Sequence, residues 1–420
     1  MRFELSATAN QALQGEINRS IIYNHIRENS PVSRTEVART LGISPSAVTR
    51  VVNALVREKY VLEAEKVETP VGKRPTPLRI NGQKGSVLAV DLSQDRLRLG
   101  LYDFAGALLS RRTGFRIQGR RESVDRLMEE IHGFLEAYLK ETGQSLKRLG
   151  LGMIGLGIPA DVDVETGRIL SACLYEEWYG VNFKEKLEKE FRLPVLVEKD
   201  VTLSVLAEKR VGAGRNHRNI AFIEVSNGVS AGIICNEQLI RGASGSAGQI
   251  AFGVINPDSE SFRGQNMGYL DKCASIQGIR QRMAQEIGRG GVSSIAALPG
   301  FKAEEVDPAA VCQAALDGDQ LASEVIGHAV GLLARSLLNL VLVVNPDVLV
   351  LGGLVSNLPG ADKLFAAAIA GYISQAIPFK VPEVRISALG EEVVLVGASL
   401  RAVEALVAGS FPYRLGGGSV

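Results

Sequence analysis

The sequence predicts an α/β protein in which an N-terminal winged helix-turn-helix module precedes a two-lobed α/β domain. Three patterns support this prediction. Residues 33–60 carry the cap and turn signals of two short helices. From Gly85 onward apolar strands alternate with helical stretches, and the layout of residues 87–109 recurs at 220–242. A chain of 420 residues is long enough for two or three domains. We expect them to span residues 1–82, 83–208 and 209–420.

The centre of the N-terminal module is predicted to be a helix, a tight turn and a second helix. Ser33 and Glu36 have the capping-box spacing, in which each side chain satisfies a backbone N–H at the helix start. Gly42 is suited to end that helix, and Ser44 followed by Pro45 supplies an N-cap and a first-position proline for the next. This order of signals is typical of a helix-turn-helix.

The second of these helices has an apolar face and a polar face. Its apolar positions are Val48, Val51, Val52, Leu55 and Val56. The opposite face offers donors for phosphates and base edges, which favours binding in the DNA major groove. The residues that we expect to contact DNA from this helix and its cap are Ser44, Ser46, Thr49, Arg50 and Asn53. The alternative is a helical hairpin with a solvated polar face.

The flanking segments complete the predicted module. Apolar residues at helical spacing predict a long helix over residues 9–28. After Tyr60, the alternating and proline-containing residues 61–81 predict a two-stranded wing. Lys73 and Arg74 lie in a Gly-Lys-Arg-Pro stretch of this wing, and we expect them to reach a minor groove or DNA phosphates. A charged interdomain linker is the alternative.

Charge and composition narrow the class of protein. Residues 1–82 contain 12 Lys and Arg against 8 Asp and Glu, whereas the rest of the chain contains 35 against 38. The small basic excess therefore lies where phosphate contacts would need it. The N-terminus lacks a signal-peptide core and no apolar run predicts a membrane span, so we expect a cytoplasmic protein without membrane contacts. The scattered cysteines, which predict neither disulfides nor a zinc loop, are Cys173, Cys235, Cys273 and Cys312.

The elements after the wing follow in a regular order. Predicted strands lie at residues 85–93, 95–104, 108–117, 149–163, 194–198, within 220–242, at 347–353 and at 384–389. Predicted helices lie at residues 122–142, after Asp200 and ending at Val211, at 307–344, after Gly360 and at 393–407. Two lobes built from related strand pairs imply a cleft between them.

Several stretches in this order resemble the transcriptional-repressor branch of the ROK family (repressors, open reading frames and sugar kinases). Besides the N-terminal module and its Gly-Lys-Arg-Pro wing, they are residues 157–159 (Gly-Ile-Pro), 198–200 (Glu-Lys-Asp), 228–250, 345–353 and 389–398. The resemblance covers nearly the whole chain. It implies a winged helix-turn-helix fused to a two-lobed domain of the actin/hexokinase type.

The two phosphate loops of the kinases in this family do not match this chain. The first has the form D-x-G-G-T, but residues 91–95 read Asp-Leu-Ser-Gln-Asp, so side chains block the approach and Asp95 places a carboxylate where phosphate would sit. The second has the form G-T-G-x-G-x-G, but residues 226–232 read Ser-Asn-Gly-Val-Ser-Ala-Gly. Because phosphoryl transfer depends on positioned phosphates, we expect no ATP cofactor and no kinase activity.

The zinc ligands that the resemblance implies are also missing. The family joins the histidine of G-E-I-G-H to three cysteines of C-x-C-G-x-x-G-C-L-E, whereas this chain has Phe252 at the histidine position and Phe262, Gly264 and Tyr269 at the cysteine positions. None of these is an ordinary zinc ligand, so we expect no zinc. Packing of the three aromatic side chains would hold the loop instead.

The resemblance further implies a sugar pocket whose residues are altered but still polar. The family's Asn-Asp pair, motif glutamate and final glutamate correspond to Lys199 with Asp200, Gln249 and Asp271, which are the effector-binding residues that we expect. Asp200 matches the catalytic base of the kinases and could accept a hydrogen bond from a ligand hydroxyl. The end of a buried strand facing a cleft is a usual ligand position, although Lys199 and Asp200 could also form a solvated turn or a helix cap.

Together these expectations describe a DNA-binding regulator, as a repressor of carbohydrate-related genes, that senses a sugar, a sugar acid or a sugar phosphate. Lys199 is the reason to include acidic sugars. Binding two half-sites of a double-stranded operator requires a homodimer or a larger homo-oligomer, and ligand closure of the lobes would lower operator affinity. The alternatives are an active sugar kinase with a DNA-binding module and a regulator controlled by a protein partner.

Overall fold

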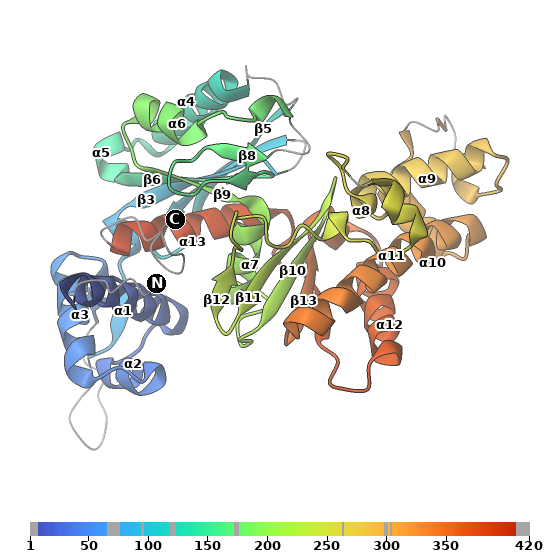
Figure 1. Cartoon of the computed structure of the whole chain (residues 1–420). Coiled ribbons are helices and arrows are strands. Elements are labelled where there is room, and N and C mark those ends of the chain that lie inside the picture. The colour runs from blue at the N-terminus through green and yellow to red at the C-terminus, as the bar shows by residue number, and fades with distance from the viewer. Residues whose placement is uncertain are drawn as a thin grey trace.

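The computed structural model describes residues 7–64, 76–93, 96–117, 123–171, 176–262, 264–297, 301–302 and 305–408. Figure 1 shows a helical N-terminal module beside two sheet-containing lobes, with the final long helix between the module and the first lobe. The predicted fold class is confirmed, since an N-terminal helix-turn-helix precedes two mixed α/β sheets.

The N-terminal module is a winged helix-turn-helix. Its elements are α1 (Ala7–Asn29), α2 (Arg34–Leu41), α3 (Pro45–Arg57), β1 (Val61–Glu63) and β2 (Leu78–Ile80). Strands β1 and β2 pair antiparallel, which confirms the predicted two-stranded wing. The wing residues Lys73 and Arg74 lie outside the described residues.

The local signals of the sequence form the caps that they predict. Ser33 and Glu36 make both hydrogen bonds of a capping box, and Gly42 ends α2 with a φ of 64°. That left-handed conformation favours glycine, because a Cβ would be strained there. Ser44 accepts the Ala47 N–H at 3.3 Å, and Pro45 opens α3.

Each lobe is built around a five-stranded sheet with the same topology. In each sheet the first three strands of the chain form an antiparallel meander. Two further strands then extend the sheet, pairing parallel to the first strand and to each other. The first sheet has the order β5 (Leu108–Arg116), β4 (Arg96–Asp103), β3 (Ser86–Asp91), β6 (Leu151–Ile158) and β9 (Val195–Lys199). The second has the order β12 (Gln238–Ile240), β11 (Val229–Cys235), β10 (Ile220–Val225), β13 (Val348–Gly352) and β14 (Glu383–Ile386). The repeated strand pairs of the sequence are thus the equivalent strands of two related sheets.

The longer helices form layers on the faces of these sheets. They are α4 (Ser123–Thr142), α6 (Phe183–Phe191), α7 (Asp200–Val211), α9 (Ile276–Gly288), α10 (Pro308–Leu316), α11 (Gln320–Val344), α12 (Ala368–Ala376) and α13 (Val393–Ala408). Helices α4 and α6 share a core with one face of the first sheet, and α9–α12 share a core with one face of the second. Between the two sheets lie α7 and α13.

Shorter elements connect these layers. They are α5 (Leu146–Leu149), α8 (Tyr269–Cys273) and the hairpin β7 (Asp161–Val162) with β8 (Ile169–Ser171). The 3₁₀ segments are η1 (Gly82–Lys84), η2 (Glu176–Trp178), η3 (Ile250–Phe252), η4 (Pro257–Phe262), η5 (Ser294–Ala297), η7 (Gly353–Asn357) and η9 (Gly390–Glu392). The π-helical segment η8 (Asp362–Ala367) continues into α12. The predicted helical tract at 307–344 is two helices, because Gly318 with φ 92° separates α10 from α11.

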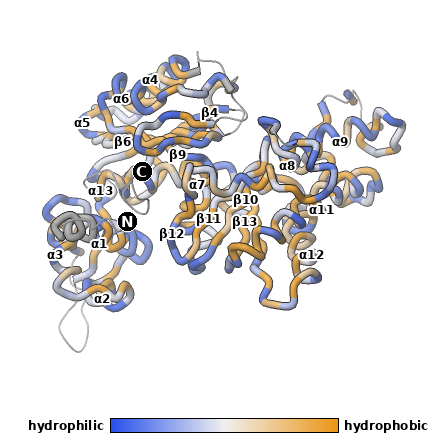
Figure 2. The backbone as a smooth tube through the Cα atoms, viewed as in Figure 1, coloured by the Kyte–Doolittle hydropathy of each residue, from blue (hydrophilic) through white to orange (hydrophobic). Residues whose placement is uncertain are grey.

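The core between the sheets continues into the N-terminal module. Ile22, Val52 and Leu78 of the module belong to the same buried apolar cluster as Val201 of α7 and Val403 of α13. Figure 2 shows the orange, apolar strands enclosed between the helices. The module therefore shares a buried core with the lobes and is not joined to them by a linker alone.

One helix resembles a membrane span by composition. Helix α11 has 25 residues and an 18-residue window of mean hydropathy 1.7, but 61% of that window is buried inside the protein. It is the central core helix of the second lobe, and among the described residues no other helix is long and apolar enough to span a membrane.

The domain limits after residues 82 and 208 remain our proposal.

Candidate functional site

The polar face of α3 is exposed, as the helix-turn-helix interpretation requires. Ser46, Thr49, Arg50 and Asn53 all lie at the surface, while Val48, Val52 and Leu55 are fully buried against the rest of the module. The Thr49 hydroxyl donates to the Pro45 carbonyl at 2.8 Å. Arg50 has no hydrogen-bond or ion-pair partner within the part of the chain that the structure describes, so its guanidinium is free to contact phosphate or a base edge.

Asn53 is tied to the other elements of the module through Arg34. The Arg34 guanidinium donates to the Asn53 side-chain oxygen at 3.1 Å and forms an ion pair with Glu63 at 2.7 Å. Helix α2, helix α3 and strand β1 thus share one polar contact. It leaves the Asn53 amide NH₂ group available as a donor.

All four predicted effector-binding residues line one cavity between the lobes. Lys199 and Asp200 lie where β9 meets α7, and Gln249 and Asp271 come from the second lobe. The cavity has a volume of about 80 Å³ and lies at the carboxyl ends of β3, β6, β9 and β10. Ligands of α/β folds usually bind at this edge. A solvated turn is wrong for Lys199 and Asp200, because both residues are buried. The helix-cap alternative is correct for their place in the fold, since Lys199 is the N-cap of α7 and Asp200 is its first residue.

Asp161 organises the polar side of this cavity. Its carboxylate pairs with the Lys199 ammonium group at 2.8 Å, accepts the Ser246 hydroxyl at 2.8 Å and accepts the Gln249 amide at 3.2 Å. Lys199 from the first lobe and two residues of the second lobe therefore meet at one carboxylate. The positive charge of Lys199 is already neutralised by Asp161.

Two buried carboxyl groups, those of Asp200 and Glu224, line the same cavity and interact electrostatically. Burial raises the pKa of Asp200 well above its ordinary value, and the nearby Glu224 carboxyl raises it further. Burial also raises the pKa of Glu224 to about 7, although a hydrogen bond from Ser226 opposes the shift. Both groups therefore favour their protonated forms more than exposed carboxyls do, and a protonated carboxyl can donate as well as accept a hydrogen bond.

Asp271 holds the loop that corresponds to the family's second phosphate loop. Its two carboxylate oxygens accept the Val229 N–H at 2.7 Å and the Gly268 N–H at 2.9 Å. A Cβ at Gly228 would lie 3.0 Å from the same carboxylate. The Val229 N–H, a backbone donor of that loop, is thus occupied by a side chain of the protein.

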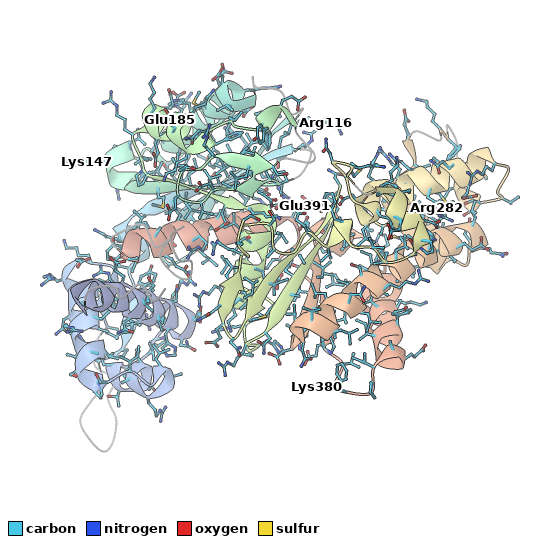
Figure 3. The ribbon with its side chains drawn as sticks, viewed as in Figure 1. Arg116, Lys147, Glu185, Arg282, Lys380 and Glu391 are labelled. Atoms are coloured by element: carbon cyan, nitrogen blue, oxygen red, sulfur yellow. The ribbon has the colours of Figure 1, made fainter. Side chains whose placement is uncertain are left out.

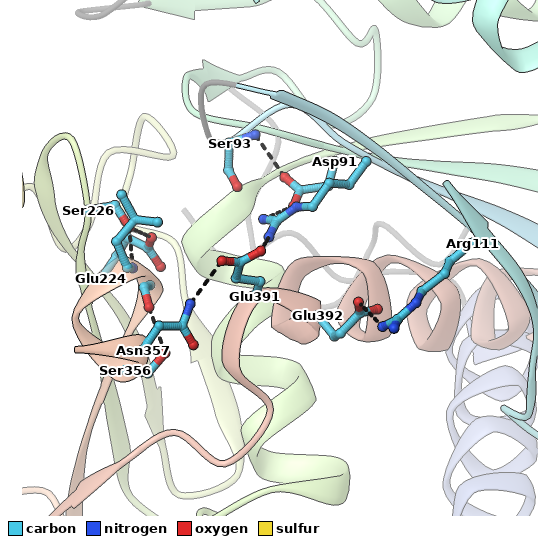
Figure 4. A network of polar contacts seen from close by, with 12 residues as sticks. Asp91, Ser93, Arg111, Glu224, Ser226, Ser356, Asn357, Glu391 and Glu392 are labelled. Carbon is cyan, nitrogen blue, oxygen red and sulfur yellow. Dashed lines mark hydrogen bonds and ion pairs between the residues drawn. The ribbon is translucent and has the colours of Figure 1, made fainter. Parts of the chain in front are cut away.

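The position of the first phosphate loop is filled by an ion-pair network (Figure 4). Asp91 at the end of β3 accepts the Ser93 N–H at 2.8 Å and the Arg98 guanidinium at 3.0 Å. Arg98 also contacts Glu391 at 3.4 Å, and Glu391 accepts the Asn357 amide at 3.0 Å. Figure 3 places Glu391 between the two lobes. Residues Gln94 and Asp95, which the sequence analysis placed in the phosphate site, lie outside the described residues.

The positions of the family's zinc ligands form an aromatic pocket. The rings of Phe262 and Tyr269 pack edge to face with centroids 5.3 Å apart, and Phe252 lines the same pocket of about 270 Å³ but is 41% exposed. Among the described residues no group of three or more His, Cys, Asp or Glu side chains could hold a metal ion. Packing of Phe262 with Tyr269 agrees with the expected aromatic contact, whereas Phe252 contributes less than expected.

Sequence analysis missed three residues of the cavity, namely Asp161, Glu224 and Ser226. Asp161 follows Gly157-Ile158-Pro159 after one alanine, and Glu224 lies near the end of an apolar strand. An acid at the end of a buried strand was the available signal in both places. The acid at Glu224 was part of the repeated strand pattern, but no role in the cavity was predicted for it or for Asp161.

Comparison with known proteins agrees with this architecture. A model of the ROK family matches residues 87–404, and a model of winged helix-turn-helix DNA-binding domains matches residues 16–61. The xylose repressor of Caldicellulosiruptor bescii is 25% identical over 406 residues, which cover 96% of this chain and 99% of that protein. The transcriptional dual regulator NagC of Escherichia coli is 24% identical over 368 residues, which cover 87% and 86%.

Two solved structures have the same fold. A ROK family transcriptional regulator described as a homolog of the E. coli MLC protein aligns with a TM-score of 0.78 and 23% identity, covering 95% of this chain and 98% of its own. A ROK family glucokinase from Streptomyces griseus aligns with a TM-score of 0.65 and 22% identity, covering 76% and 99%. Because the family model spans well over half of the sequence, the chain belongs to the ROK family.

Proposed function

We propose that this protein is a transcriptional repressor of carbohydrate-related genes that binds operator DNA and senses a sugar without phosphorylating it. The observation that carries the proposal is a winged helix-turn-helix with an exposed polar α3 face, packed on a lobed domain that has a polar cavity. The names of the xylose repressor and of NagC support this function. The residues proposed to contact DNA remain Ser44, Ser46, Thr49, Arg50, Asn53, Lys73 and Arg74.

Kinase activity is disfavoured by the groups at both phosphate-loop positions. Arg98 and Glu391 pair beside Asp91, and Asp271 occupies the Val229 N–H. A nucleotide phosphate would have to break these contacts and lie close to the carboxylates of Asp91, Glu391 and Asp271. Phosphoryl transfer requires donors and cations in those places.

The charge of the cavity favours a neutral sugar as the effector. Among its described lining residues four carry carboxyl groups and one carries an amine, and that amine is paired with Asp161. A sugar acid or sugar phosphate would meet carboxyl groups without a free cation. Neutral hydroxyls can donate to Asp161 and exchange hydrogen bonds with Asp200 and Glu224. Because Lys199 is paired with Asp161, it no longer favours the acidic ligand that the sequence suggested.

The size of the cavity bears on how such a ligand enters. A volume of about 80 Å³ is below the ~300 Å³ of usual ligand pockets. We therefore propose that the lobes move apart to admit a sugar, in place of the lobe closure expected from the sequence, and that a pentose needs less movement than a hexose. We propose an aldopentose such as D-xylose as the first compound to test, in keeping with the name of the xylose repressor.

We further propose a cytoplasmic homodimer or larger homo-oligomer, because two half-sites of an operator must be bound together. Sedimentation equilibrium of the purified protein tests this proposal. A monomer at micromolar concentration, with or without DNA, would contradict it.

The proposed function is tested by DNA selection followed by sugar titration. The purified protein selects duplexes from a random pool, and fluorescence anisotropy then measures its affinity for the selected operator with and without D-xylose, D-glucose, N-acetylglucosamine, D-glucuronate and glucose 6-phosphate. We expect a neutral sugar to change operator affinity, and no phosphate release from ATP with any sugar. Sugar-dependent ATP consumption would establish the kinase alternative, and failure to select any DNA sequence would refute the regulator.

A further inference from the structure

Helix α7 runs from the sugar cavity to the DNA-binding module. Its first residue, Asp200, lines the cavity, and its penultimate residue, Arg210, contacts α1 of the module. These two residues are ten positions apart, which corresponds to about 15 Å along an α-helix. One rigid element thus has an end in each of the two proposed binding regions.

The module end of α7 lies in a group of charges around the buried Glu404, in which Arg210 and Glu28 are partly buried. Arg210 forms ion pairs with Glu28 of α1 at 3.6 Å and with Glu404 of α13 at 3.3 Å. Asn24 of α1 donates to Glu404 at 2.8 Å, and Arg401 pairs with the same carboxylate at 2.6 Å. Arg210 is therefore the only residue of α7 among these contacts, and it joins α7 to both neighbouring helices.

This group, the Glu404 cluster, consists of Arg27, Glu28, Arg210, Arg401 and Glu404. Burial opposes the charge of Glu404, but the nearby arginines outweigh it and lower the pKa of Glu404 to about 2. Within the described residues the guanidinium nitrogens of Arg27 lack hydrogen-bond partners although they are buried. Because buried charges are costly when a partner moves away, the cluster is sensitive to the position of Arg210.

The body of α7 is clasped on two sides at close range. A Cβ at Gly232 of β11 would overlap the Val201 carbonyl oxygen, and a Cβ at Gly397 of α13 would overlap the Leu203 carbonyl oxygen. The backbone of α7 therefore lies directly against both neighbours. Such close packing disfavours bending of α7 between Asp200 and Arg210.

We propose that α7 couples the cavity to the DNA-binding module, with Arg210 as the residue that transfers its displacement to α1 through the Glu404 cluster. The proposal rests on the function proposed above, in which the cavity binds a sugar. Opening of the lobes by the ligand shifts α7, weakens the contacts of Arg210 with Glu28 and Glu404, and changes the position of α1 and hence of α3. The sugar then favours the shifted position of α7 and the operator favours the unshifted one, so each ligand lowers the affinity for the other.

The test is a set of full-length variants that change one end of α7, the other end, or both. Asp200→Ala removes the carboxyl at the cavity, with Asp200→Asn as a milder form, and Arg210→Gln removes the charge at the module. Lys209→Gln is the matched control, because Lys209 is the neighbouring cation on α7 but contacts the His217 carbonyl and Glu237 instead of α1. Each variant is measured for operator affinity by anisotropy, with and without D-xylose, and for D-xylose binding by calorimetry.

We expect the substitution at Asp200 to change operator affinity about threefold or more in the wild-type and Lys209→Gln backgrounds. In the Arg210→Gln background the same substitution should change operator affinity by less than about twofold, which is the deviation from additivity that independent sites show. Arg210→Gln should still bind D-xylose like the wild type, and Arg210→Lys should partly restore coupling. Equal effects of the Asp200 substitution in all backgrounds, or no effect in any, would overturn the coupling proposal.

The same design separates failure of coupling from failure of sugar sensing. If D-xylose binds none of the proteins, the sensing proposal fails for this sugar, and the Asp200 and Arg210 substitutions still decide the coupling. If Arg210→Gln binds no operator, hydrogen exchange of residues 17–29 in α1 replaces anisotropy as the readout. Protection there should then respond to Asp200→Ala in the Lys209→Gln protein and not in the Arg210→Gln protein.

Discussion

Replacing Asp161 with asparagine should change the kind of ligand that the cavity accepts. In the wild-type protein the Asp161 carboxylate holds the Lys199 ammonium group at 2.8 Å and faces a cavity that is lined by three further carboxyl groups. Asp161→Asn keeps the shape of the side chain and an acceptor for Ser246, but it removes one negative charge. Lys199 then becomes available to an anionic ligand.

The size of the effect follows from the geometry. An anionic group that reaches Lys199 lies within about 5 Å of Asp161, because Lys199 and Asp161 are themselves 2.8 Å apart. At that distance two unit charges in an effective dielectric of about 20 interact with ~3 kcal/mol, which corresponds to a ~150-fold change in affinity. The affinity for D-xylonate, relative to that for D-xylose, should therefore rise by up to about two orders of magnitude in Asp161→Asn.

Calorimetry with the neutral and the anionic sugar measures this ratio directly. Loss of its partner leaves Lys199 buried, which costs up to ~3–5 kcal/mol of stability, so circular dichroism must first confirm folding at the assay temperature. Lys199→Gln is the matched control, because it leaves Asp161 unpaired and should move the ratio in the opposite direction. An unchanged ratio in Asp161→Asn would refute the charge argument, and with it the choice of a neutral effector.

Three further predictions concern other parts of the molecule. Arg50→Ala should lower operator affinity by ~1–3 kcal/mol, measured by anisotropy, while the distant and exposed Arg289→Ala should have no effect; equal losses would contradict readout by α3. Because burial raises the pKa of Glu224 to about 7, the wild type should lose stability relative to Glu224→Gln as the pH rises from about 5 to 8, by up to ~3 kcal/mol in chemical denaturation; a pH-independent difference would rule this out. Metal analysis of the purified protein should find far less than one zinc per chain, and one equivalent would show that Phe262 and Tyr269 do not replace the family's ligands.

The N-terminal module could be predicted almost completely because its signals are local. The capping box of Ser33 with Glu36 and the left-handed Gly42 each depend on residues at most three positions away. The strand pairs were predicted for the same reason, since they are hairpins. Of the pairs between distant strands, such as β6 with β9, the sequence indicated only that buried strands exist.

The cavity was predicted in its position but not in its chemistry. Family resemblance identified Lys199, yet the carboxylate that pairs with its ammonium group belongs to Asp161, 38 residues away. Asp161 also accepts a hydrogen bond from Ser246, which is 85 residues away in the sequence. Such partners depend on how the lobes pack, and no local pattern reports that. The Asp91–Arg98 pair is an intermediate case, because the two residues are directly opposite in the β3–β4 hairpin and its register would have predicted their contact.

The contacts of Glu391 bear on how the proposed sugar sensor would work without a nucleotide. This residue receives Arg98 from the first lobe and Asn357 from the second, and it lies immediately before α13, which packs on α7 and α1. The protein thus supplies its own charged bridge between the lobes at the position that matches the phosphate loop. This bridge consists of one hydrogen bond and a long ion pair, so breaking it costs little beside the Asp161 contacts and the apolar core that also join the lobes. In the proposed sensor, the hydroxyl contacts of one small sugar would supply the energy to break this bridge, without a nucleotide to hold or to hydrolyse.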